Sequence, residues 1–142
     1  MIVCYTNKMR TIHKIAAVVI KDNKFLMVRK KGKDIWTSLG GRMEQGETEE
    51  QCLLREIKEE ASCDAKIIKK LGDFSEKACF DDAMLLLSTY LVELQGEINC
   101  EDPELEEVKF IEKNFEEQGV KPSLTITKQI VPFCIKEGLL HW

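Results

Sequence analysis

Two runs of apolar residues near the start of the chain predict a pair of neighbouring strands. Residues 11–21 contain six consecutive apolar positions, and residues 24–30 contain four more. Short apolar runs bounded by polar residues are typical of buried strands. Asp22 and Asn23 lie between the two runs, and both residue types tolerate the backbone of a tight hairpin turn. The pattern therefore predicts a β-hairpin, followed by a loop that extends to Gly41.

The next periodic segment, residues 48–62, has the spacing of an amphipathic helix. Thr48 is a suitable N-cap, because its side-chain oxygen can accept a hydrogen bond from a backbone N–H of the first turn. Apolar residues recur on one face at intervals of three to four positions. They are Leu53, Leu54, Ile57 and Ala61. This face is expected to pack against a core.

The second half of the chain alternates apolar runs with polar breaks. Strands are predicted over residues 66–74, 84–94 and 108–111, the last of them after an acidic stretch that is expected to be loop. Residues 125–136 have helical spacing, although Pro132 argues against a straight, uninterrupted helix. Strands before and after a central helix, with a second helix at the end, predict an α/β fold with a mixed sheet.

Composition narrows the classes of partner. The chain has 21 lysines and arginines against 25 aspartates and glutamates. The resulting net charge of −4 argues against binding to long nucleic acid, whose affinity comes mainly from neutralised phosphates. No stretch approaches the roughly 18 apolar residues of a membrane span, so no membrane partner is expected. A single cytoplasmic domain over residues 1–142, as a monomer or homodimer, is the simplest expectation.

Cysteine spacing argues against a zinc site. The six cysteines contain no C-x-x-C pair or other paired ligand spacing. In a cytoplasmic chain of this size, reduced and mostly buried thiols are expected.

Three carboxylates lie on one face of the predicted central helix. Glu56, Glu59 and Glu60 are spaced at i, i+3 and i+4. Like charges at this spacing cost about 0.2–0.5 kcal/mol per pair, and anions near the end of a helix cost a further ~0.3–1 kcal/mol. A solvated acidic face is the ordinary interpretation of such a charge run. A bound divalent cation would remove both penalties, and ligands that are all oxygen favour magnesium, manganese or calcium over zinc.

The segment around these carboxylates resembles the Nudix box of the Nudix hydrolases, G-x5-E-x7-R-E-U-x-E-E-x-G-U, in which U is a bulky apolar residue. The matching positions are Gly41, Glu47, Arg55, Glu56, Ile57, Glu59 and Glu60. Ser62 replaces the last glycine of the box, and Cys63 fills its final apolar position. The box spans residues 41–63, and the predicted elements around it follow the order of a Nudix domain. The resemblance implies a single-domain α/β/α sandwich with a mixed β-sheet.

The resemblance also implies a metal centre. Glu56, Glu59 and Glu60 would serve as catalytic, metal-binding carboxylates for Mg²⁺ or Mn²⁺, with Glu60 as the surest ligand. The carbonyl of Gly40 would contribute a further oxygen.

Two further roles follow from the family pattern. Glu47 and Arg55 would form an ion pair that holds the loop on the helix. One more carboxylate, a ligand or general base, is expected from a loop ahead of a late strand, and its spacing to Phe110 favours Glu104. The alternatives for this carboxylate are Glu101, Glu106 and Glu107.

The implied reaction is hydrolysis of a nucleoside di- or triphosphate or a related diphosphate-linked compound, including oxidised nucleotides. Glu56 or Glu104 would take the proton from the attacking water. Lys30, with Lys31 and Arg29 as alternatives, would hold distal phosphates of this small-molecule substrate. Trp36 or Phe74 would stack on the base, and Thr37 or Ser123 would form a hydrogen bond with it. The alternatives are a Nudix-fold module that binds nucleotides or regulates without turnover, and a plain acidic interaction domain without metal dependence.

Overall fold

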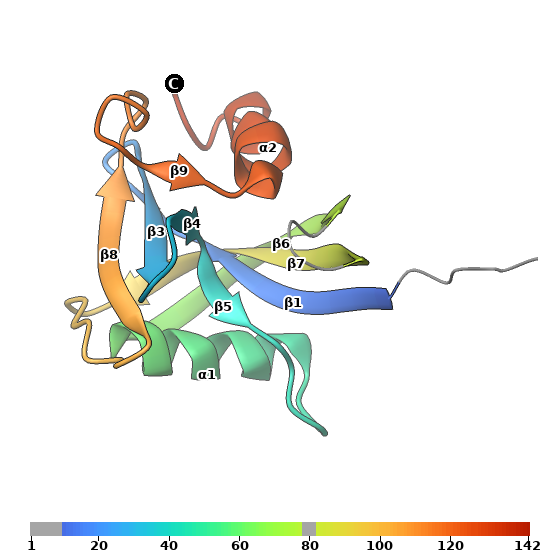
Figure 1. Cartoon of the computed structure of the whole chain (residues 1–142). Helices are drawn as coiled ribbons and strands as arrows, with labels where there is room; N and C mark the ends of the chain where they lie inside the picture. The colour runs from blue at the N-terminus through green and yellow to red at the C-terminus, as the bar shows by residue number, and fades with distance from the viewer. Residues whose placement is uncertain (1–9, 78–81) are drawn as a thin grey trace, which may run out of the picture.

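The computed structural model describes residues 10–77 and 82–142, and two β-sheets form its centre (Figure 1). Sheet A consists of β1 (Arg10–Val18), β5 (Leu39–Gly41), β6 (Asp64–Lys77) and β7 (Ala83–Gln95). Its strands lie in the spatial order β5-β1-β7-β6. β1 and β7 run parallel, and the two outer strands are antiparallel to their neighbours. The sheet is therefore mixed, as predicted.

Sheet B is built around the second strand of the predicted hairpin. Its strands are β2 (Ile20–Lys21), β3 (Lys24–Lys30), β4 (Ile35–Thr37), β8 (Leu105–Ile111) and β9 (Lys121–Pro122). β3 pairs antiparallel with β2, β4 and β8, and β9 runs parallel to β4. Just beyond β3, the Lys31 N–H donates to the Glu104 carbonyl at 2.9 Å. This pairing brings the loop before β8 to the end of the hairpin.

Helical segments cover opposite sides of the strands (Figure 1). α1 (Glu49–Ala61) packs against β1, β5 and β6. A π-helical turn over Ile126–Ile130 and α2 (Val131–Lys136) lie on the other side. Two apolar cores, one with residues of α1 and one with residues of α2, fill the spaces between helices and strands. The predicted α/β/α sandwich is confirmed.

The start and end of α1 follow from local residue chemistry. The Thr48 hydroxyl accepts a hydrogen bond from the Gln51 N–H at 3.1 Å, and the Gln51 side chain accepts one from the Thr48 N–H at 3.0 Å. The predicted N-cap is therefore part of a reciprocal capping box. At the other end, Ser62 adopts a left-handed backbone with φ of 53°. This conformation favours glycine and costs other residues about 1–2 kcal/mol.

The structure differs from the sequence prediction in several details. The predicted loop up to Gly41 contains β4 and β5, which at three residues each are too short to show a period of two. Part of the acidic stretch is strand, because β8 begins at Leu105. Leu54 is 41% exposed, since the core-facing stripe of α1 passes through its neighbour Leu53 instead. The C-terminal helix is divided, as the position of Pro132 predicted. Pro132 lies in the first turn of α2, where its missing N–H costs no hydrogen bond.

The cysteines were expected to be reduced and mostly buried, and no membrane-spanning segment was expected. The buried and free cysteines are Cys52, Cys63 and Cys134. Cys100 is free but exposed, while Cys4 and Cys79 lie outside the described residues. None of the helices in the described part of the chain is long and apolar enough to span a membrane.

Candidate functional site

Glu60 is the buried carboxylate of the acidic face on α1. The residue is only 5% exposed, whereas the side chains of Glu56 and Glu59 are 17% and 53% exposed. One Glu60 oxygen accepts a hydrogen bond of 2.8 Å from the Gly40 backbone N–H. Burial raises the pKa of Glu60 to about 8, against the opposing effect of that hydrogen bond. Because a buried carboxylate is costly without a countercharge, this group gains most from a bound cation.

The paired glycines allow β5 to lie close to β1 and α1. Gly40 has a φ of 142°, and a Cβ there would lie 1.9 Å from the Ile15 carbonyl oxygen. A Cβ on Gly41 would lie 2.5 Å from a Glu56 carboxylate oxygen. The absence of a side chain is therefore needed at Gly40 for the backbone and at Gly41 for the position of a carboxylate.

Arg55 lies at the centre of an ion-pair network beside these carboxylates. Its guanidinium binds both oxygens of Glu47, at 2.7 and 2.9 Å, in the bidentate geometry of a strong ion pair. It also contacts Glu56 at 3.0 Å and Glu59 at 3.3 Å. The hydrogen bonds from Arg55 lower the pKa of Glu47 to about 2. The predicted pair is thus present, and it joins the loop before α1 to the helix.

A pocket of about 340 Å³ opens beside the three helix carboxylates, and Glu104 lines it with them. The structure therefore brings the predicted fourth carboxylate to the acidic face. The three alternatives do not line this pocket. Glu107 instead forms an ion pair with Arg29 at 3.0 Å, and Glu101 accepts a hydrogen bond from Asn99 at 2.7 Å.

The same pocket contains residues that the sequence does not predict. Lys30, the expected phosphate-binding residue, lines it, but so do Lys14, Arg42 and Asp102. β1 and β5 pair as far as Ile15 and Gly41, and Lys14 and Arg42 are the next residue on each side of that last pair. The position of Arg42 next to β1 therefore depends on β5, which is too short to be predicted from the alternation of apolar and polar residues. In the sequence, the only feature that distinguishes Lys14 is that it is a charged residue next to an apolar run.

The NUDIX domain model matches residues 11–124 of the chain. The chain belongs to this family. Its relatives include the ADP-ribose pyrophosphatase of Methanocaldococcus jannaschii, 29% identical over 104 residues, which are 70% of this chain and 61% of that protein. The NAD-capped RNA hydrolase NudC of Pseudomonas fluorescens is 33% identical over 76 residues, which are 54% of this chain and 26% of that protein.

The fold agrees with solved structures of the family. The NUDIX hydrolase from Nitrosomonas europaea superposes with a TM-score of 0.74 at 16% identity, over 95% of this chain and 97% of that one. The matches to the two curated relatives span less than two thirds of the length of either protein. The similarity therefore shows the Nudix family and fold of this chain.

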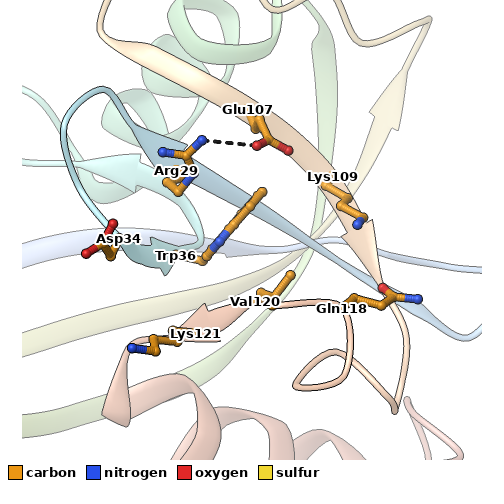
Figure 2. A pocket seen from close by; sticks show the side chains of 9 residues that line it. Arg29, Asp34, Trp36, Glu107, Lys109, Gln118, Val120 and Lys121 are labelled. Atoms are coloured by element: carbon orange, nitrogen blue, oxygen red, sulfur yellow. Dashed lines mark hydrogen bonds and ion pairs between the residues drawn. The ribbon is translucent and has the colours of Figure 1, made fainter.

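In this Nudix domain, Trp36 and Thr37, which were both expected to contact a base, lie apart from the helix carboxylates. Trp36 is 5% exposed and lines a second pocket, of about 410 Å³. Figure 2 shows it below the ion pair between Arg29 and Glu107. The Arg29 guanidinium lies 5.7 Å from the centroid of the Trp36 ring. Thr37 pairs with Val28 in the β3–β4 ladder and lines neither pocket.

The donors at the Nudix box suit a hard divalent cation. The side chains lining the pocket that could bind a metal are carboxylates, with no imidazole or thiol among them, and such oxygen ligands favour Mg²⁺ or Mn²⁺. Within residues 10–77 and 82–142, no three Asp, Glu, His or Cys side chains already lie close enough together to hold one ion. Glu56 and Glu59 are bound by Arg55 instead, so an ion would compete with Arg55 for them. Glu60 has no such competitor.

Proposed function

We propose that this chain is a divalent-metal-dependent hydrolase of nucleoside diphosphate-linked compounds. The observation that carries the proposal is the buried Glu60 carboxylate, in a pocket shared with Glu56, Glu59 and Glu104. Family membership supports the reaction class. The names of the two curated relatives, ADP-ribose pyrophosphatase and NAD-capped RNA hydrolase, both refer to nucleotide-linked compounds and support the substrate class.

The helix glutamates would hold Mg²⁺ or Mn²⁺, and the Gly40 carbonyl stays a predicted further ligand. The chemistry supplied there is neutralisation of phosphate charge and acidification of a water molecule. Arg55 restrains the carboxylates of Glu56 and Glu59, which keeps both at the pocket. Glu104 has no side-chain partner among the described residues, so it is available to accept the proton of the attacking water. Glu56 is the alternative base.

A substrate panel with matched variants tests this proposal. ADP-ribose, NADH, UDP-sugars, nucleoside triphosphates and oxidised purine nucleotides are incubated with Mg²⁺, Mn²⁺ or a chelator, and product release is measured. Glu60→Gln keeps the hydrogen-bond acceptor for Gly40 but removes the charge. Glu50→Gln is the control, because Glu50 is exposed on the same helix and lines neither pocket.

Wild type and Glu50→Gln should cleave at least one diphosphate compound only when metal is present. Glu60→Gln should lower kcat/KM by orders of magnitude with an unchanged melting temperature, because the metal contributes several kcal/mol to the transition state. Equal turnover by Glu60→Gln and wild type would show that the metal site is misassigned. A panel compound that raises the melting temperature without being cleaved would instead favour a binding module.

A further inference from the structure

Three cations line the candidate pocket without partners. The side chains of Lys14, Lys30 and Arg42 form no hydrogen bond or ion pair with any described residue. Five carboxylates line the same 340 Å³ space, yet none of them pairs with these cations. Opposite charges that share a pocket this small without pairing leave room for a ligand that contacts both groups.

Lys14 is the most firmly positioned of the three. It lies within β1, where it pairs with Leu87 of β7 and directly precedes the residues paired with β5, whereas Lys30 and Arg42 are exposed at strand ends. Burial lowers the pKa of Lys14, and the charges of Lys30 and Arg42 lower it further, while the charges of Glu60 and Glu56 oppose this shift. A half-buried ammonium group beside two other cations is stabilised by an anion with several oxygens, and lysine binds phosphate as a point charge.

The formal charges of the lining suit a metal together with a diphosphate. With every carboxylate ionised, as metal binding requires, three cations against five carboxylates leave the pocket at −2, which repels an anion. One divalent cation at the helix glutamates would cancel this excess. The three cations would then remain to attract phosphate oxygens. A monophosphate has fewer oxygens to share between the metal and the cations than a diphosphate has.

We propose that Lys14 is a substrate-binding residue that donates a hydrogen bond to a non-bridging oxygen of the substrate diphosphate. This inference rests on the proposed function, because it assumes that a diphosphate binds at the helix glutamates. Lys14 fixes the diphosphate relative to the carboxylates through the β1–β5 ladder, and it favours diphosphate compounds over monophosphates. Its contribution is to binding and not to the transfer of a proton.

The test compares Lys14→Met, which keeps the length of the side chain, with Lys14→Arg, which restores a charge. Lys66→Met is the control, because Lys66 is exposed on β6 and lines neither pocket. Binding of ADP and of AMP is measured by calorimetry with Mg²⁺, and ADP-ribose hydrolysis gives KM and kcat. Circular dichroism melting shows that each variant is folded.

Lys14→Met should bind ADP about 10–100-fold more weakly, the usual loss for one charge-assisted hydrogen bond. Its affinity for AMP should fall less than about threefold, and KM should rise while kcat stays within about threefold. Lys14→Arg and Lys66→Met should stay near wild type. ADP binding by Lys14→Met within twofold of wild type, or a fall in kcat at unchanged KM, would overturn the role of Lys14.

The outcomes for the two proposals are separable. Cleavage of ADP-ribose that is insensitive to Lys14→Met removes only the role of Lys14. Binding of ADP that depends on Lys14, with no compound of the panel cleaved, removes the hydrolase and leaves the binding residue. A wild type that neither binds ADP nor cleaves any diphosphate overturns both.

Discussion

A single methyl group added at Gly41 should lower the catalytic rate while leaving the stability of the fold nearly unchanged. In Gly41→Ala, the new Cβ would lie 2.5 Å from a carboxylate oxygen of Glu56 and 2.6 Å from its carboxyl carbon. Both atoms end a flexible side chain. The clash is relieved when the carboxylate moves by about 1 Å, to an ordinary contact of about 3.5 Å. The backbone of Gly41 needs no change, because its φ is not positive.

A displacement of about 1 Å at a reacting group costs roughly 100-fold in rate. We therefore expect kcat of Gly41→Ala to fall about 100-fold for the compound that wild type cleaves best. The free energy of unfolding should change by less than about 1 kcal/mol, because only one partly exposed side chain moves. The measurements are steady-state hydrolysis with Mg²⁺ and urea unfolding followed by circular dichroism.

Gly40→Ala is the matched variant with the opposite expectation. Its Cβ would lie 1.9 Å from the backbone oxygen of Ile15, and φ at Gly40 is 142°. Neither feature can be relieved by a side-chain rotation, so unfolding should become easier by about 3 kcal/mol or more, with Tm lower by roughly 10 °C. The reasoning is refuted if Gly41→Ala keeps the wild-type kcat, or if it loses as much stability as Gly40→Ala.

Two further variants test the residues that hold the loop before α1 and the end of α1 in place. Glu47→Gln should destabilise the protein at pH 7 but not near pH 2, because the pKa of Glu47 is lowered to about 2 in the fold. Its stabilising effect is therefore complete above the ordinary glutamate pKa of 4.5 and is lost as the pH falls through 2. The difference between the melting temperatures of the two proteins should shrink steadily as the pH falls from 4.5 to 2.5, and a constant difference would contradict this. Ser62→Gly should stabilise the protein by about 1 kcal/mol in urea unfolding, because Ser62 has a φ of 53°. An unchanged or lower stability would show that the left-handed conformation is not strained.

Local spacing was sufficient to predict the long elements and the acidic face. The hairpin turn at Asp22-Asn23 has positive φ at both residues, as a two-residue turn of this kind requires. The ion pair between Glu47 and Arg55 was predicted from the family pattern, and its two residues lie eight positions apart on one loop and helix. Such features depend on residues close in sequence, where helical and strand periods are informative.

Features that depend on distant pairing were not predictable in the same way. β4 and β5 are too short to have a period, although β5 places the glycines against α1. Lys14 and Arg42 line one pocket because β1 and β5 pair in one particular register. Glu104 was selected through the family pattern and its spacing to Phe110, since the helical and strand periods do not distinguish it from the other acidic residues before β8.

The β1–β5 ladder links the two groups of pocket residues. Pairing of Ala16 with Gly40 sets the N–H that binds Glu60, and pairing of Ile15 with Gly41 sets the close approach of Glu56. Lys14 follows in the same register. A slip of one residue would reverse the face of every β1 side chain, so the register that positions the carboxylates also positions Lys14. The separation between the acidic and basic parts of the pocket is therefore set by backbone hydrogen bonds, which is the rigidity that orienting a diphosphate requires.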